Sequence, residues 1–134
     1  MPGFADLPET HRDLLEAPLT AVLTTLDAKG RPQSTAVWYL LRDGQLIVSI
    51  TEPRQKYRNL IADQRVNLFI LDPENRMRAL EIRADAVLTH DPDKDDVAAI
   101  ATAYGVDPEA IKATPGERYT VTLVPHRIVV TPAA

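Results

Sequence analysis

Alternating hydrophobic and polar positions mark several stretches of the chain as β-strands. Residues 77–90, MRALEIRADAVLTH, place Leu80 and Ile82 on one face and Glu81 and Arg83 on the other. This period of two is typical of a strand with one buried face. The same alternation, or a high content of β-branched residues, predicts five further strands at 19–26, 32–42, 45–51, 65–72 and 118–131.

Three segments outside these strands carry helix signals. Residues 8–17 form a short amphipathic pattern that buries leucines on one side. Asp91 is placed as an N-cap and Gly105 as the terminator of a second helix, whose first turn is acidic. A shorter helix is predicted to begin at Asp107.

A fourth helix is predicted directly after the strand at 45–51. Pro53 is expected to set its first turn, because proline is tolerated at the start of a helix. Tyr57, Leu60 and Ile61 recur at helical spacing and are expected to form its buried stripe.

The connections favour an antiparallel sheet. Asp43-Gly44, between the strands at 32–42 and 45–51, is a strong hairpin signal, and regular strand–helix–strand alternation is missing. Six strands in 134 residues would close most economically into a small barrel with helices outside. We therefore expect a mainly β protein, a six-stranded antiparallel barrel with peripheral helices, built as a single domain over 1–134.

Composition narrows the function. The net charge of −4 and the pI of about 5.3 argue against nucleic acid as a partner, because such binding needs broad positive potential. The chain has no cysteine, and no stretch approaches the roughly 20 apolar residues that span a bilayer. We expect a cytoplasmic protein that binds neither nucleic acid nor membrane.

A local basic cluster stands out against this acidic background. Arg54, Lys56 and Arg58 lie where the fourth predicted helix begins. A helix N-terminus carries partial positive charge, so basic side chains there are unfavourable unless an anion lies among them. The cluster predicts a site for a small anion, although a solvated basic face paired with nearby acids is the alternative.

Other reactive groups are scarce. His11, His90 and His126 lie in different predicted elements without a second ligand at metal spacing, so no metal site is expected. No nucleophile motif or phosphate-binding glycine loop is present, and no side chain stands out as a general acid or base. Catalytic residues stay unassigned, which fits a redox enzyme whose cofactor carries the chemistry.

Two motifs carry a resemblance. Residues 30–39, GRPQSTAVWY, and 49–59, SITEPRQKYRN, separated by the Asp-Gly hairpin, resemble the paired signatures of the pyridoxamine 5′-phosphate oxidase-like split-barrel superfamily. Within it they are most similar to the flavin/deazaflavin oxidoreductases that use coenzyme F420. The resemblance implies an FMN-binding split-barrel fold and a homodimer with cofactors in grooves at the subunit interface.

The resemblance also implies cofactor-binding residues. These are Gln33, Ser34, Ser49, Ile50, Thr51, Arg54, Lys56 and Asn59, with Met77 or Arg78 at a place where some relatives have an aromatic residue. Asn59 is expected on the outer side of the helix, and Arg58 has weaker standing. Trp38 and Tyr39 must point to opposite faces of their strand. One is expected in the core or at an interface and the other beside the cofactor, and the sequence does not decide which.

The leading hypothesis is an F420-dependent reductase that transfers hydride between the deazaflavin and a small unsaturated organic substrate. An FMN-dependent oxidase or reductase is the alternative within the same fold. A non-catalytic protein that binds flavin or haem is a third possibility from another class.

Overall fold

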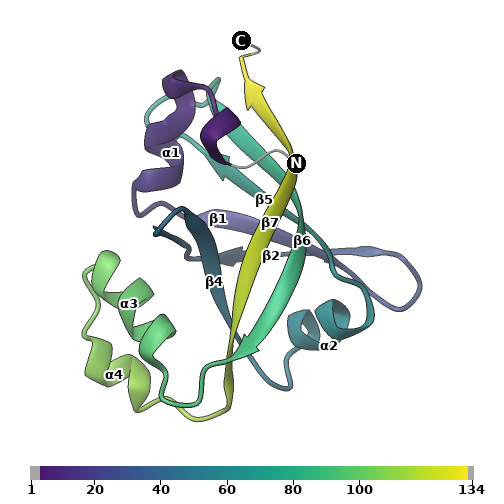
Figure 1. The fold of residues 1–134 in the computed structure, drawn as a ribbon, viewed down its shortest axis with the longest axis vertical. Helices are drawn as coiled ribbons and strands as arrows, with labels where there is room; N and C mark the ends of the chain where they lie inside the picture. Colours follow the sequence, from purple (N-terminus) through teal and green to yellow (C-terminus); the bar gives the residue numbers. More distant parts are fainter. Residues whose placement is uncertain (1–3, 133–134) are drawn as a thin grey trace.

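The computed structural model describes residues 4–132, and it contains a seven-stranded sheet in which all neighbouring strands are antiparallel (Figure 1). The strand order is β2-β1-β5-β6-β7-β4-β3. The strands are β1 (Ala21–Leu26), β2 (Pro32–Val37), β3 (Leu40–Arg42), β4 (Gln45–Thr51), β5 (Arg65–Leu71), β6 (Ala79–His90) and β7 (Arg118–Thr131). The mainly β, antiparallel fold class is confirmed.

The expectation of six strands is wrong, because the predicted strand at 32–42 divides in two. Its first half, β2, pairs with β1, and its second half, β3, pairs with β4. These two ladders lie at opposite edges of the sheet. Trp38 and Tyr39 join the edges, so this one short crossing brings the two ends of the sheet together.

The core follows the period of two that the sequence displays. The inward side chains of the strands are almost fully buried, among them Leu23, Leu46, Leu68, Ile70, Leu80, Ile82 and Leu123. Burying each such side chain contributes roughly 1.5–3 kcal/mol. β6 pairs with β7 along its whole length, with a register shift between Arg83 and Ala84, where Ala84 lies opposite Pro125.

The helices surround the sheet (Figure 1). They are α1 (Arg12–Glu16), α2 (Gln55–Ala62), α3 (Asp95–Ala103) and α4 (Pro108–Lys112), with 3-10 turns at Phe4–Asp6 and Glu9–His11. The segment predicted as one helix over 8–17 is thus a 3-10 turn followed by a single short helix. Within residues 4–132, no helix is long and apolar enough to cross a membrane.

Two helix starts differ from expectation. α3 begins at Asp95 rather than beside Asp91, because Lys94 adopts a left-handed conformation with φ of 59°. The Asp91 carboxylate still caps this helix, accepting hydrogen bonds from the N–H groups of Asp96 and Val97. α2 begins after Arg54, which is its N-cap residue, so Pro53 lies outside the helix.

The buried face of α2 is rotated from the predicted one. Leu60 is buried and Tyr57 is half-buried, but Ile61 is 62% exposed. Asn59 takes its place against the sheet and is 2% exposed. The expectations for Ile61 and for an outward Asn59 are therefore both wrong, because hydrogen bonds to polar groups on the sheet, described below, hold Asn59 inside.

Candidate functional site

The barrel has a seam where β2 and β4 meet without pairing. Among the described residues, β2 pairs only with β1. β3 pairs with β4 only as far as Ile47, so on this edge of β4 the described residues after Ile47 have no strand partner. Two hollows open along this seam. The helix-end hollow, about 320 Å³, is lined by Gln33, Thr35, Arg54, Gln55 and Lys56.

The second hollow, which we call the tryptophan chamber, adjoins the first. It measures about 250 Å³ and is lined by Ala36, Val37, Trp38, Ser49, Lys56, Val97, Ile100, Ile111 and Arg118. Lys56 borders both hollows. Together they form a seam groove whose walls come from β2, β4, β7 and the helices α2, α3 and α4.

Three cations gather in the seam groove. Burial lowers the pKa of Lys56, and the charges of Arg54 and Arg118 lower it further. Burial also lowers the pKa of Arg118, as does the charge of Arg54, and this outweighs the opposing effect of Asp91. Within residues 4–132, none of the three cations forms an ion pair. The groove therefore carries positive charge that an anionic ligand would neutralise.

Unpaired polar atoms occur in the same groove. In the described part of the chain, three buried side-chain atoms lack a hydrogen-bond partner: Thr35 Oγ1, Ser49 Oγ and Arg118 Nε. All three residues line the seam groove. A buried polar atom without a partner costs about 1–3 kcal/mol. Their concentration at one place makes the groove suited to a ligand that offers hydrogen-bond partners.

The start of α2 adds further donors to the helix-end hollow. The first N–H groups of a helix have no partner within the helix and carry partial positive charge. No side chain of residues 4–132 caps this terminus, and the N-cap position is occupied by Arg54 itself. Free N–H groups and two basic side chains together form an arrangement suited to a phosphate group.

An aromatic pair forms one wall of the tryptophan chamber. The rings of Trp38 and Tyr104 stack with centroids 4.6 Å apart and planes 9° from parallel. Tyr104 is fixed because its hydroxyl donates to the carbonyl of Leu19 at 2.6 Å and accepts from the N–H of Tyr39 at 3.1 Å. Burial raises the pKa of this hydroxyl, so it stays protonated as the donor.

The question that the sequence left open for Trp38 and Tyr39 is settled by this arrangement. Tyr39 is 2% exposed in the core, and its hydroxyl donates to the carbonyl of Leu14 at 2.6 Å. Trp38 is 40% exposed and lines the groove. Trp38 is therefore the aromatic residue that a ligand in the seam groove would meet.

Asn59 supports the groove from behind. Its side-chain amide donates to Gln33 Oε1 at 3.1 Å and to Thr25 Oγ1 at 3.0 Å. Its own oxygen accepts from Gln55 Nε2 at 2.6 Å. These bonds fix the orientation of Gln33 on β2 relative to the start of α2, so Asn59 positions a groove residue without lining the groove.

Four of the predicted site residues line the groove, namely Gln33, Ser49, Arg54 and Lys56. The side chain of Ser34 lies on the opposite face of β2, where it hydrogen-bonds to Thr24 Oγ1 at 2.8 Å. Ile50 is buried in the core, and Thr51 is half-buried at the end of β4.

Met77 and Arg78 lie apart from the seam groove. Met77 is 75% exposed. Arg78 is engaged elsewhere, pairing with Asp13 on α1 and with Asp72 after β5 and donating to the carbonyl of Thr10. Within one chain, Met77 and Arg78 therefore do not line the seam groove, where a bound cofactor would be expected to meet them.

Arg118 was not predicted as a groove residue. The β4–β7 register pairs Arg118 with Thr51, and this brings it close to the start of α2. A single basic residue at the start of a strand is unremarkable on its own. Thr35 and the apolar residues of α3 and α4 were also missed, because a pairing or packing between distant segments creates their setting.

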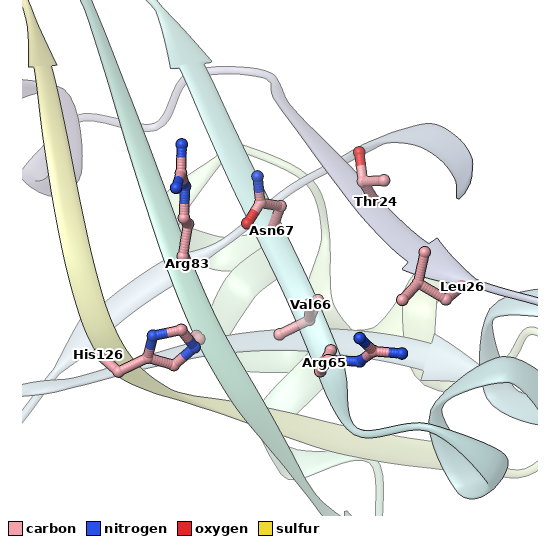
Figure 2. Close-up of a pocket in the computed structure, with 8 residues that line it drawn as sticks. Thr24, Leu26, Arg65, Val66, Asn67, Arg83 and His126 are labelled. Carbon is pink, nitrogen blue, oxygen red and sulfur yellow. The ribbon is translucent and has the colours of Figure 1, made fainter. Parts of the chain in front are cut away.

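A hollow of about 300 Å³ on the outside of the barrel differs in character (Figure 2). Its two arginines, Arg65 and Arg83, are paired with Asp63 and Glu81. The hydrogen bonds that Arg65 donates to the Asp63 carboxylate raise the pKa of Arg65. Because its cations are already neutralised, this hollow is less suited to an anion than the seam groove.

Comparisons with known proteins fit this geometry. The family described as Pyridoxamine 5′-phosphate oxidase matches residues 7–129. A solved structure called F420 Reductase is 32% identical, covering 91% of this chain and 98% of its own, with a TM-score of 0.82. A search of the curated proteins finds no match to this sequence.

Two other solved structures share the fold at lower identity. A conserved hypothetical protein from Mycobacterium tuberculosis is 20% identical, covering 98% of this chain and 89% of its own, with a TM-score of 0.74. A heme binding protein from Mycobacterium smegmatis is 21% identical, covering 99% of this chain and 55% of its own, with a TM-score of 0.67.

Proposed function

Because this chain belongs to the pyridoxamine 5′-phosphate oxidase family, we propose that it is an oxidoreductase that uses coenzyme F420 to reduce a small unsaturated organic substrate. The observation that carries the proposal is the seam groove, in which three cations have no ion-pair partner and three buried polar atoms have no hydrogen-bond partner among residues 4–132. The 32% identity to the protein called F420 Reductase supports a deazaflavin over other cofactors.

The residues of the groove fit such a cofactor. Arg54, Lys56 and the N–H groups at the start of α2 would hold its phosphate. Gln33 and Ser49 would hydrogen-bond to the polar edge of its ring system. F420 carries a phosphodiester and a glutamate tail with several carboxylates, whereas FMN carries a single phosphate. A groove with several unpaired cations suits the longer anion.

When bound, the deazaflavin supplies hydride chemistry to the site. The protein contributes binding, orientation and exclusion of water. Val97, Ile100 and Ile111 give the tryptophan chamber an apolar wall, which keeps water from the reacting atoms. Trp38 is held by Tyr104, so it offers a fixed surface on which a flat group is oriented.

We further propose that the protein works as a homodimer. Val22 and Phe69 are cross-strand neighbours on the outer face of the sheet and are 38% and 40% exposed, and Leu71 beside them is 42% exposed. An apolar patch of this kind is typical of a subunit interface. Analytical ultracentrifugation should give a species of twice the 14.8 kDa chain mass. A single 14.8 kDa species at micromolar concentration would contradict the dimer.

Titration of the full chain with F420, FMN and hemin tests the cofactor. Cofactor fluorescence for the first two, and absorbance for hemin, give the dissociation constants. We expect F420 to bind more tightly than FMN, and binding to weaken as salt is raised, because the contacts are ionic. Tighter FMN binding would favour an FMN-dependent enzyme. Binding of hemin alone would favour a haem-binding protein and overturn the proposal.

A further inference from the structure

We propose that the tryptophan chamber binds the substrate, and that Arg118 recognises a carboxylate on that substrate. The inference rests on the proposed function, since it assumes that the cofactor's anionic groups occupy the helix-end hollow. It assigns to the chain a substrate class, small planar unsaturated carboxylates, and a residue that selects it.

The cations of the seam groove are divided between the two hollows. Arg54 lines only the helix-end hollow, Arg118 lines only the tryptophan chamber, and Lys56 borders both. A cofactor phosphate at the start of α2 therefore has its own partners. Arg118 is left as the cation of the chamber.

Arg118 has no ion-pair partner among residues 4–132. Its Nε is buried without a hydrogen bond. Asp91 is close enough to affect its pKa, but the Asp91 carboxylate already accepts the N–H groups that cap α3. Asp96, on α3, is bound by Arg42 and Thr120. A guanidinium whose buried Nε has no partner is suited to a ligand carboxylate, which it binds through a fork of hydrogen bonds.

The shape and polarity of the chamber also favour a planar ligand with a charged group. Trp38 presents the flat surface of a stacked ring pair, and the side chains from α3 and α4 are aliphatic. Arg118, Ser49 and Lys56 supply the polar groups. At about 250 Å³ the chamber lies just below the range of about 300–1,000 Å³ that is typical of sites for drug-sized ligands. It therefore suits a small molecule with a planar apolar body and one charged group.

The chain provides its own reporter for this site. Trp38 is the single tryptophan of the sequence, and it lines the chamber. Quenching of tryptophan fluorescence therefore reports binding there, whether or not a reaction occurs. Suitable probes are cinnamate and cinnamamide, which have nearly the same size and conjugation and differ in charge.

The experiment titrates both probes into the full chain, with and without saturating F420. We expect cinnamate to bind at least about tenfold more tightly than cinnamamide, which corresponds to about 1.4 kcal/mol. Arg118→Gln should abolish this preference, and Arg118→Lys should keep part of it, because lysine retains the charge but not the fork. Arg127→Gln, an exposed arginine on the same strand, is the matched control and should behave like the parent.

The outcomes separate this inference from the proposed function. Equal binding of the two probes, or an unchanged preference in Arg118→Gln, overturns the role of Arg118 while F420 binding stands. Loss of F420 affinity in Arg118→Gln with the probe preference intact assigns the residue to the cofactor and also overturns the inference. Failure of the parent to bind F420 overturns the proposed function itself. Circular dichroism of each variant verifies folding, which removal of an unpaired buried charge should not impair.

Discussion

Two clusters of basic residues in this protein have opposite surroundings. Arg78 lies between two acids, with its Nε 2.9 Å from Asp72 Oδ2 and Nη1 2.9 Å from Asp13 Oδ1. In the seam groove, Arg54, Lys56 and Arg118 lie near one another without an ion pair to any described residue.

The pKa values of the basic residues are shifted in opposite directions in the two clusters. The hydrogen bonds that Arg78 donates to Asp13 and Asp72 raise the pKa of Arg78, and Arg78 in turn lowers the pKa of Asp13. In the groove the pKa values of Lys56 and Arg118 are lowered instead. The charge of Arg78 is thus favoured by the fold, whereas the charges of Lys56 and Arg118 are disfavoured in the ligand-free chain. The first cluster therefore holds elements together, and the second is suited to an anionic ligand.

The largest expected effect is on ligand binding. Arg54→Ala and Lys56→Ala should each weaken F420 binding by about tenfold or more, roughly 1.4 kcal/mol, because each removes a charge-assisted contact. Fluorescence titration gives the affinities, and Lys29→Ala, an exposed lysine on another turn, serves as the control. If both groove variants bind F420 as well as the parent does, the cluster is only a solvated basic face.

The paired cluster should respond in the opposite way. Arg78→Met should lower the thermal midpoint by a few degrees, because it detaches α1 from the loop after β5, and F420 affinity should be retained. Since Arg78 lowers the pKa of Asp13, the stability it contributes is complete above the ordinary aspartate value of 3.8 and is lost as the pH falls through the lowered value. Thermal melts at several pH values measure this.

Loss of F420 affinity in Arg78→Met without a change in the melting temperature would contradict the comparison. It would place Arg78 in the site of the assembled protein, as the resemblance to F420-dependent relatives implies.

A smaller effect concerns the stability of the ligand-free protein. Lys56→Met should raise the thermal midpoint slightly, because it removes a half-buried charge that lies near two other cations. The folded pKa of Lys56 is lowered, so the unfolded state binds the proton more strongly, and the stability of the parent rises with pH between the lowered value and the ordinary 10.5. The advantage of Lys56→Met should therefore shrink as pH is raised from 7 toward 10, whereas Lys29→Met should show no such trend.

The smallest effect is expected for Arg58, the third basic residue of the run. Its guanidinium donates to the carbonyl of Pro53 and to Gln55 Oε1, and it is exposed. Arg58→Ala should change F420 affinity by less than about twofold, since an exposed guanidinium that is already engaged by protein acceptors contributes little. A tenfold loss of F420 affinity, measured by titration, would contradict this. It would mean that position within residues 54–58, and not the lack of a protein partner, determines which basic residues bind the cofactor.

Much of the fold could be predicted because its signals are local. The period of two over 77–90 and the Asp-Gly turn at 43–44 each depend on neighbouring residues, and the structure agrees with both. The division of the strand at 32–42 was not predictable in this way. Both halves have strand-like sequences, and only pairing with different partners separates them at Trp38.

The candidate site shows the same limit. The sequence by itself determined a mainly β chain, a run of basic residues at the start of α2 and the family motifs, because propensity, turn chemistry and charge spacing act over a few residues. Tertiary structure decided that Asn59 faces inward, that Trp38 and not Tyr39 lines the groove, and that Arg118 joins Lys56 across 62 residues of sequence. These outcomes depend on strand register and on which groups lack a partner after the chain has folded, and no short stretch of sequence contains that information.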